Sequence, residues 1–387
     1  MSIPILNLSW ASDPTLKPGL LQHLKAALFD VGFLYVTNHG VEQETIDNLK
    51  DLLPELFALP SEEKAKMSKL NSPHFLGYSG FAEERTIGKP DLREQFDLAT
   101  DLPVVYQAVN GHSQTTNGVH RDEQKTSERE RDFSKLYWRL RGPNQFPPEG
   151  AVPGFRKAFT EYHDAVQELS YRFVHLVEEA FGIPIGTFDH FFGRQAGKTT
   201  QQSRDFLPPQ HRIKLLRYPP SEQEDGGQGV GAHKDSSGWL TFLYQVGDEP
   251  GLEVLSSTGK WLPVRPIKGS FVVNFGNAFD AATEGAVKAT IHRVISPGPK
   301  SNVRYSIPFF QGLPLDMSVS EVRSYVPESV RRMRREAGRE NDETQSFLDP
   351  RWDSLGESQL RKWIRSHKDV ALKHYGQEAV NYYTAAD

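Results

Sequence analysis

Between residues 212 and 312 the sequence consists of short apolar runs separated by turn-forming residues. Seven such runs recur at a spacing of roughly ten residues. Gly, Pro, Asn and Ser interrupt them, and each run is too short to form a stable helix. The runs cover 213–218, 239–245, 252–255, 261–264, 270–275, 290–295 and 304–310. Short strands in this arrangement predict an antiparallel sandwich or barrel.

Helical periodicity surrounds this segment on both sides. Apolar residues at helical spacing predict helices over 15–30, 42–58 and 154–182, and the charged sequence after 320 predicts another helix over 360–373. A short apolar run within 31–40 reads as a buried strand that ends in a turn. The expected fold class is therefore α+β, mainly β, with N-terminal and C-terminal helices packed around a β core.

Composition excludes several kinds of chemistry and partner. The 387 residues include no cysteine, which excludes disulfides, thiolate metal sites and cysteine nucleophiles, so that any metal must take nitrogen and oxygen ligands. A net charge of −5 without a basic tract predicts no nucleic-acid partner and no membrane surface. Without a secretory leader or a long apolar run, a cytoplasmic protein acting on a small molecule is expected. The oligomeric state is left open, and a monomer is compatible with the sequence.

One motif suggests a metal site, namely His233 and Asp235 two residues apart. Chance alone gives about 1.7 His-x-acid triplets in a chain of this composition, and three are present, so the motif by itself is weak. The other two, at 120–122 and 367–369, lie in a polar segment and in a predicted helix. Residues i and i+2 point about 200° apart on a helix but to the same side of a strand. Only His233 and Asp235 are therefore expected to share one ion, because they stand at the mouth of the predicted strand 239–245. The glycine-rich run at 226–231 before them reads as a flexible approach to the metal.

A second histidine completes this set. His292 lies in the β-rich run 290–295 and is expected on another strand of the same barrel. Two histidines and one carboxylate on one face leave open positions on an octahedral metal, an arrangement that suits non-haem Fe(II). A purely structural role for all three residues is the alternative, and their matched order on strands disfavours it.

Arg304 and Ser306 form another i, i+2 pair on a predicted strand. A guanidinium and a hydroxyl that point the same way into a barrel make a receptor for a carboxylate, since a buried arginine without an anion is costly. A structural ion pair, or recognition of a substrate carboxylate, remains the alternative for these two residues.

These motifs together resemble a known family. Their order is similar to that of the isopenicillin-N-synthase-like branch of the 2-oxoglutarate/Fe(II)-dependent dioxygenases, and the chain looks most like fungal members of specialised metabolism. The resemblance rests on 233–235, 292–294 and 304–306, and on the segments 32–41, 56–64, 89–96 and 215–220. It implies a double-stranded β-helix, the jelly-roll or cupin-like fold, as the core.

The resemblance also implies a reaction and a role for each residue. His233, Asp235 and His292 would be the catalytic metal ligands for Fe(II), and Arg304 and Ser306, with Tyr218, would bind the co-substrate 2-oxoglutarate. O₂ is the other co-substrate. An oxidoreductase of this kind hydroxylates, desaturates or cyclises a small organic molecule and releases succinate and CO₂.

Five regions follow from the same comparison. They are an N-terminal dioxygenase region (1–103), a polar insertion (104–135), a helical support (136–210), the 2-oxoglutarate/Fe(II) dioxygenase core (211–315) and a C-terminal helical extension (316–387).

Three other functions are weighed against this one. An oxidase of the same fold that does not use 2-oxoglutarate would keep the three metal ligands. The segment 84–91 resembles a stretch of ethylene-forming members that bind arginine, although Arg85 would oppose a cationic ligand. A non-enzymatic binding protein is disfavoured because all three ligand residues are present.

The polar insertion at 104–135 generates a first prediction. Its charge density cannot support a buried face, so we expect a mobile, solvent-facing segment. Limited proteolysis of the substrate-free protein should cut here first. Full protection of the segment would indicate a packed lid or an oligomer interface instead.

Overall fold

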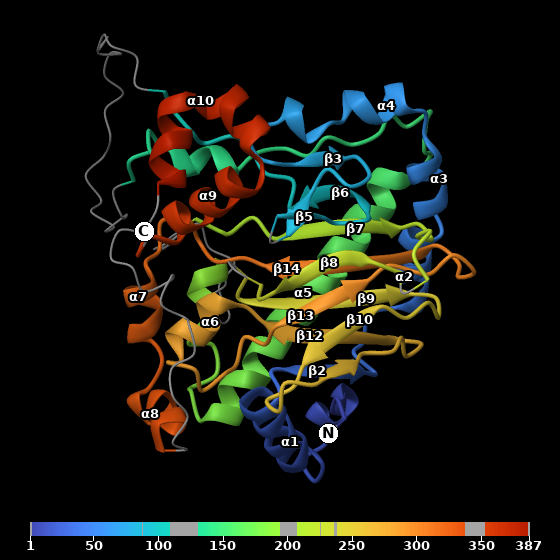
Figure 1. Ribbon diagram of the computed structural model, residues 1–387. Helices are drawn as coiled ribbons and strands as arrows, with labels where there is room; N and C mark the ends of the chain where they lie inside the picture. The colour runs from blue at the N-terminus through green and yellow to red at the C-terminus, as the bar shows by residue number, and fades with distance from the viewer. Residues whose placement is uncertain are drawn as a thin grey trace.

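The structure is a computed structural model of the chain and describes residues 2–86, 88–108, 131–193, 207–224, 226–235, 238–336 and 353–385. Two sheets lie face to face in its centre (Figure 1). The larger has eight strands in these residues, in the spatial order β1 (Ile5–Asn7), β2 (Phe33–Thr37), β12 (Ser270–Phe275), β9 (Leu240–Val246), β14 (Arg304–Gln311), β7 (Arg212–Tyr218), β6 (Glu94–Ala99) and β3 (Gly77–Ser79). The smaller has the order β11 (Trp261–Pro263), β10 (Leu252–Leu255), β13 (His292–Ile295) and β8 (Gln228–His233). A short hairpin joins β4 (Arg85–Thr86) to β5 (Lys89–Pro90).

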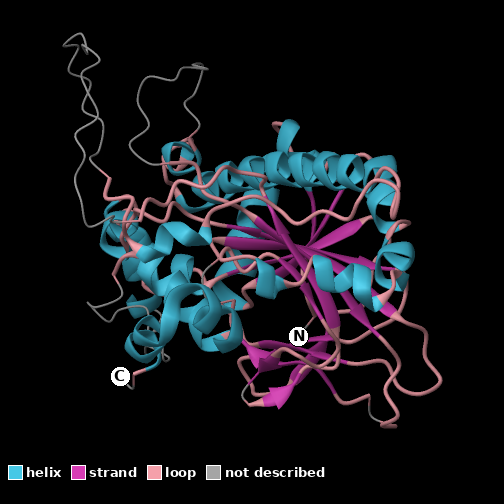
Figure 2. Cartoon of the chain, turned by 90° about the horizontal axis from the view of Figure 1, so that it is seen from above, coloured by secondary structure: helices cyan, strands magenta, loops and turns pink. Residues whose placement is uncertain are grey.

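Helices cover one side and one end of the strands (Figure 2). The longest, α5, runs behind the larger sheet in Figure 1 and buries its apolar stripe against it. The described helices are α1 (Lys17–Asp30), α2 (Gln43–Lys50), α3 (Leu53–Ala58), α4 (Ser61–Lys66), α5 (Phe155–Phe181), α6 (Asn277–Ala282), α7 (Val319–Ser324), α8 (Glu328–Glu336), α9 (Leu355–Ser366) and α10 (Lys368–Thr384), with the 3₁₀ turns η1 (Leu8–Ser12), η2 (Lys69–Asn71), η3 (Leu136–Leu140) and η4 (Asp189–Phe192). None of the described helices is long and apolar enough to cross a membrane.

A separate apolar cluster fills the space between the two sheets. Leu216 and Tyr218 of β7 meet Val230 of β8, Val254 of β10 and Val294 of β13, and all five side chains are buried. Alternate residues of a strand point to one face of its sheet. Polar residues that continue this alternation toward the end of a strand therefore face the same space between the sheets as the apolar ones.

All seven predicted apolar runs are strands, with their ends shifted by at most a few residues. The run at 226–231, interpreted from sequence as a flexible approach to the metal, was misread because β8 spans Gln228–His233 and pairs with β13. Glycine is required there by close packing, since a Cβ at Gly231 would lie 2.7 Å from Cγ2 of Thr86.

Three further differences concern the helical parts. The predicted helix at 42–58 is two helices, α2 and α3, and Pro54 lies at the start of the second. The predicted helix at 360–373 breaks at His367, whose φ of −136° and ψ of 67° are not helical. Strands β3 and β6 of the N-terminal region, which no apolar run predicted, extend the larger sheet by pairing beside β7. Most of the predicted insertion, 109–130 with His120, lies outside the described residues.

Close packing at Gly276 generates a prediction about stability. A Cβ on this residue would lie 2.1 Å from the carbonyl oxygen of Gly238 and 3.0 Å from that of Asp235. Gly276→Ala should therefore lower the free energy of unfolding by about 1–3 kcal/mol, because backbone atoms cannot yield as a side chain can. Thermal denaturation followed by circular dichroism measures this. Gly19→Ala in α1 is the matched control, because nothing lies within 4 Å of its Cβ, and an equal loss in both variants would contradict the explanation.

Candidate metal centre and its cavity

Strand pairing brings the two predicted histidines together. His233 ends β8, His292 begins β13, and the two are direct partners in the antiparallel ladder, with ring centroids 4.3 Å apart. Asp235 follows β8 by two residues. Its Oδ1 lies 3.8 Å from Nε2 of His233 and 3.6 Å from Nε2 of His292. One potential ligand atom from each residue thus falls within 4.8 Å of the others, and in the described residues no other such group occurs.

Hydrogen bonds orient each of these side chains. Nδ1 of His233 lies 2.8 Å from the carbonyl oxygen of Gly231, and Nδ1 of His292 lies 3.0 Å from that of Thr290. A carbonyl oxygen only accepts, so Nδ1 carries the proton in both rings and Nε2 keeps its lone pair. Both lone pairs are therefore available to one cation.

The carboxylate of Asp235 is held in the same way. Thr241 and Asn274 each donate a hydrogen bond of 2.7 Å to Oδ2. This leaves Oδ1, the oxygen nearer to the histidines, for a metal. Two imidazole nitrogens and one carboxylate oxygen, each fixed by a further hydrogen bond, fit the ligand preference of non-haem Fe(II).

Electrostatics favours the forms that bind a cation. Burial and the neighbouring His292 lower the pKa of His233 to about 3, so this imidazole is neutral near pH 7. Burial alone would raise the pKa of Asp235, but His292, His233 and the two hydrogen bonds outweigh it and lower the pKa to about 2. The site therefore presents a neutral His233 ring and an ionised Asp235 carboxylate.

Arg304 lies near this centre with part of its hydrogen-bonding capacity unused. It begins β14, opposite Tyr218 of β7, and its guanidinium lies 4.9 Å from the centre of the Tyr218 ring. The side chain is 1% exposed. Nη2 donates to Gln245 at 3.1 Å, but Nε and Nη1 are buried without a hydrogen-bond partner in the described structure. Ser306, also 1% exposed, lines the same cavity two residues along the strand. Such a pair of unpartnered donors fits a carboxylate.

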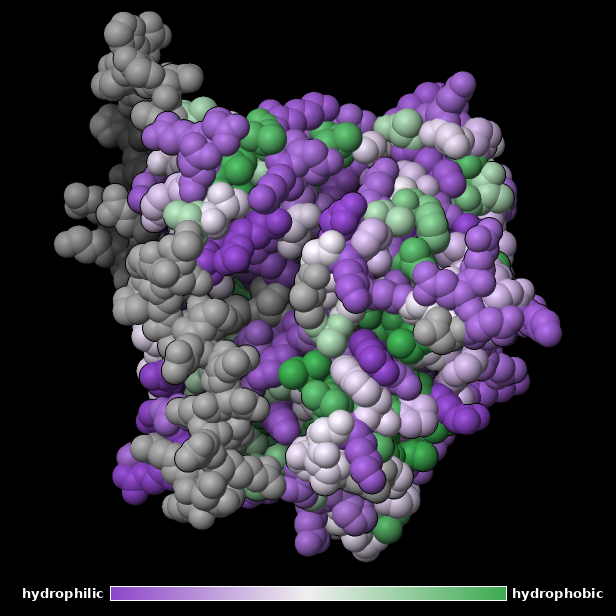
Figure 3. All heavy atoms as spheres, in the orientation of Figure 1, coloured by the Kyte–Doolittle hydropathy of each residue, from purple (hydrophilic) through white to green (hydrophobic). Residues whose placement is uncertain are grey.

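One cavity of about 450 Å³ contains all six predicted site residues in its wall. In the space-filling view, hydrophilic side chains surround a recess between α9 and the ends of the sheets (Figure 3). Apolar side chains from both sheets line its inner part: Phe33, Leu216, Val230, Leu252 and Val294. The size suits a small organic molecule beside a co-substrate.

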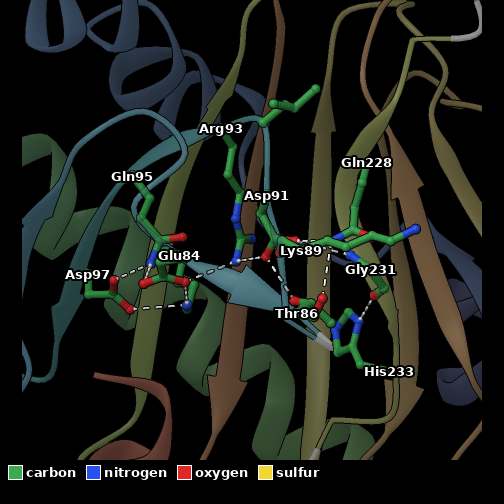
Figure 4. A network of polar contacts seen from close by, with 12 residues as sticks. Glu84, Thr86, Lys89, Asp91, Arg93, Gln95, Asp97, Gln228, Gly231 and His233 are labelled. Atoms are coloured by element: carbon green, nitrogen blue, oxygen red, sulfur yellow. Dashed lines mark hydrogen bonds and ion pairs between the residues drawn. The ribbon is translucent and has the colours of Figure 1, made fainter. Parts of the chain in front are cut away.

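Sequence reasoning missed a charged network in the wall of this cavity. Arg93 pairs with Glu84 at 3.0 Å and with Asp91 at 3.5 Å, and Asp91 accepts a hydrogen bond from the backbone N–H of Gly231 (Figure 4). The carbonyl of Gly231 in turn holds His233. Segments 84–91 and 89–96 were noted for their resemblance alone, because partners so distant in sequence leave no local pattern.

His367 was expected not to share the metal, and it contributes no candidate ligand atom, but it does line the cavity. It lies in the cavity wall at the break between α9 and α10, where its Nε2 lies 2.9 Å from Oε1 of Glu84. Burial and the nearby Lys69 lower its pKa. It contributes no ligand atom to the metal centre, so its role is in the charged network.

Comparison with known proteins agrees with these features. Residues 3–149 match the family described as the N-terminal region of a non-haem dioxygenase in morphine synthesis, and residues 210–312 match the 2OG-Fe(II) oxygenase superfamily. A 2-oxoglutarate-dependent dioxygenase, frbJ, of Dothideomycetidae sp. is 36% identical over 96% of this chain and 91% of its own.

Two further proteins are similar to this chain, one in sequence and the other in fold. The homoarginine-6-hydroxylase 2-ODD-C23.1 of Arabidopsis thaliana is 28% identical over 78% of this chain and 82% of its own. The crystal structure of a full-length Neurospora crassa protein in complex with alpha-KG has a similar fold, with a TM-score of 0.62 and 22% identity over 90% of this chain and 95% of its own.

The family match also identifies the metal and the co-substrates. The predictions of Fe(II), 2-oxoglutarate and O₂, and of an oxidoreductase, are confirmed. Three convergent candidate ligand residues, a buried Arg304 in the same cavity and the match along nearly the whole chain lead to the same conclusion, that this chain belongs to the 2-oxoglutarate- and Fe(II)-dependent dioxygenases.

Proposed function

We propose that His233, Asp235 and His292 hold the Fe(II) of this dioxygenase and that Arg304 and Ser306 bind the distal carboxylate of 2-oxoglutarate. The observation that carries the proposal is a cluster of three convergent ligand atoms in the same cavity as a buried arginine with two unpartnered N–H groups. When bound, the iron would activate O₂, which is the oxidant: two of its four oxidising equivalents convert 2-oxoglutarate to succinate and CO₂, and the other two oxidise the substrate.

The chain's own residues contribute position and protection from water. Thr241 and Asn274 orient Asp235, and two backbone carbonyls orient the histidines, so that little reorganisation is needed when a cation binds. Tyr218 supports the guanidinium of Arg304 and contributes to the 2-oxoglutarate site. The apolar lining between the sheets keeps water away from the reacting centre, which strengthens every polar contact there.

We also infer how the two sheets and the regions around them are organised. The two facing sheets form the double-stranded β-helix of the family, with the core at 211–315 and the other regions at 1–103, 104–135, 136–210 and 316–387. The substrate is a small organic molecule of specialised metabolism, oxidised by a cytoplasmic protein. The pairing of β8 with β13 and of β14 with both β7 and β9 supports this topology.

The metal centre can be tested without knowing the substrate. His233→Ala and Asp235→Ala should lose bound iron and reduce the substrate-independent turnover of 2-oxoglutarate, because each removes a ligand. Asn274→Ala, which removes only an orienting hydrogen bond, should weaken metal binding by roughly 10–100-fold. Iron content and succinate formation measure both effects.

The control for these variants is His374→Ala. This histidine is partly exposed and does not line the cavity, and its Nε2 lies 2.9 Å from the carbonyl oxygen of Leu70, so iron and turnover should stay at the wild-type level. His367 is unsuitable because it lines the cavity. An Asp235→Ala protein that keeps its iron and its turnover would exclude the assigned centre.

The 2-oxoglutarate site makes a separate prediction. Arg304→Leu removes a charge-assisted pair of hydrogen bonds and should raise the apparent 2-oxoglutarate constant by roughly tenfold or more, with Arg304→Lys intermediate because it keeps the charge but loses the fork. Ser306→Ala should cost less. All three should still bind iron.

Steady-state succinate formation against 2-oxoglutarate concentration measures this, together with iron stoichiometry. If Arg304→Leu left the 2-oxoglutarate dependence unchanged, the pair would serve another ligand, such as a substrate carboxylate.

A further inference from the structure

The charged wall of the cavity bears on the substrate, and this inference rests on the proposed function. We propose that the substrate is an organic anion whose carboxylate binds to Lys362 of α9, with Arg212 as a neighbouring cation at the Trp363 ring.

Cationic side chains outnumber carboxylates among the described residues that line the cavity. Three carboxylates contribute to the wall: Glu84, Asp91 and Asp235. The lysines and arginines are Arg85, Arg93, Arg212, Lys214, Lys234, Arg304 and Lys362. Arg304 is assigned above to the carboxylate of 2-oxoglutarate. The other cations therefore determine which charge on the substrate the cavity favours.

Glu84 is fully engaged with groups of the chain itself. Its Oε1 accepts from Lys69 at 2.7 Å and from Gln95 at 2.7 Å, and its Oε2 accepts from Arg93 at 3.0 Å. Lys214 lies a further 3.6 Å away. Burial alone would raise the pKa of Glu84, but Lys214 and Lys69 lower it well below its ordinary value. A cationic substrate would have to displace one of these partners.

The other two carboxylates are engaged as well. Asp91, 1% exposed, accepts from Thr86 at 2.8 Å and from Gln228 at 2.9 Å. Asp235 belongs to the metal centre. No carboxylate of the described wall therefore remains for a positively charged substrate group.

Among the described residues, neither Lys362 nor Arg212 forms an ion pair with a carboxylate. Arg212 donates to the backbone carbonyls of His74 and Phe75 and stacks over Trp363 at 4.3 Å, so its hydrogen bonds go to neutral groups. No carboxylate oxygen lies within 4.0 Å of Nζ of Lys362 in the part of the chain that the structure describes. Burial and the neighbouring Lys214 lower the pKa of Lys362 to about 8. A bound anion would offset the cost of burying the Lys362 ammonium and its repulsion by Lys214.

Lys362 belongs to a continuous face of α9. Residues at helical spacing on this helix line the cavity, namely Gln359, Lys362, Trp363 and Ser366. An amide, an ammonium, an indole ring and a hydroxyl side by side can bind a carboxylate and the apolar carbons next to it. Nζ of Lys362 lies 5.8 Å from the Trp363 ring, so both contacts are within reach of one small molecule.

The charge pattern of this cavity disfavours a cationic substrate group. The plant relatives are named for homoarginine, whose side chain carries a guanidinium. In this chain Glu84, which directly precedes the hairpin of β4 and β5, is neutralised internally, and α9 presents a lysine. A negatively charged substrate group therefore fits this cavity better than a guanidinium.

Calorimetric titration of the Mn(II)-loaded protein at saturating 2-oxoglutarate tests the proposal, because 2-oxoglutarate then occupies the Arg304 site. The probes are butanoate and 4-phenylbutanoate, each with its matched amide and amine. We expect the tighter-binding carboxylate to bind at least about tenfold more tightly than its amide and amine, as one charge-assisted hydrogen bond implies. Lys362→Met should abolish this preference, Lys362→Arg should restore it, and Lys368→Met, an exposed lysine outside the cavity, should behave as wild type.

Three outcomes would overturn the proposal. They are an amine or amide that binds as tightly as the acid, a preference that survives Lys362→Met, and a wild-type protein that binds neither acid at millimolar concentration. Failure of the wild type to bind 2-oxoglutarate in the first titration would instead count against the proposed function, so the two failures are distinguishable.

Discussion

The pairing of β8 with β13 is the constraint on which the site depends. It sets His233 opposite His292 and fixes both Nε2 atoms toward the carboxylate of Asp235. A slip of one residue in this ladder would turn either histidine to the other face of its strand and destroy the cluster. The ladder is irregular next to this point, with register shifts on either side of Val294, yet the histidine pair itself is in register.

Close backbone packing holds Asp235 in the remaining position. Gly276 and Gly238 allow the end of β12 to approach the loop after β8, and Asn277 donates its backbone N–H to the carbonyl of Asp235 at 2.8 Å. The side chain of Asp235 then meets Thr241 and Asn274, which lie on β9 and β12. Both sheets thus contribute to the metal centre: the smaller sheet supplies the histidines and the larger sheet orients the carboxylate.

The sequence predicted which residues would meet in one cavity, because His233 and Asp235, and likewise Arg304 and Ser306, stand two residues apart on or beside a strand. The same reasoning separated His233 from the other His-x-Asp motifs by local geometry. It did not place His367 in the cavity wall, since a break in helical backbone at a single residue leaves no signal in apolar periodicity. It also missed Glu84, Arg93 and Lys362, because charged side chains that pair or line a cavity follow no apolar periodicity. The strands β6 and β8 were missed for a related reason, as tertiary contacts stabilise their polar and glycine residues.

The most direct test of the account is pulsed electron paramagnetic resonance of the protein loaded with Mn(II), before and after addition of 2-oxoglutarate. The account predicts one ion per chain, nitrogen couplings from two imidazoles, and a change in the coordination of the ion when 2-oxoglutarate binds. A spectrum without imidazole nitrogen couplings, or one that 2-oxoglutarate leaves unchanged, would contradict the central claim that His233, Asp235 and His292 hold the metal to which this co-substrate binds.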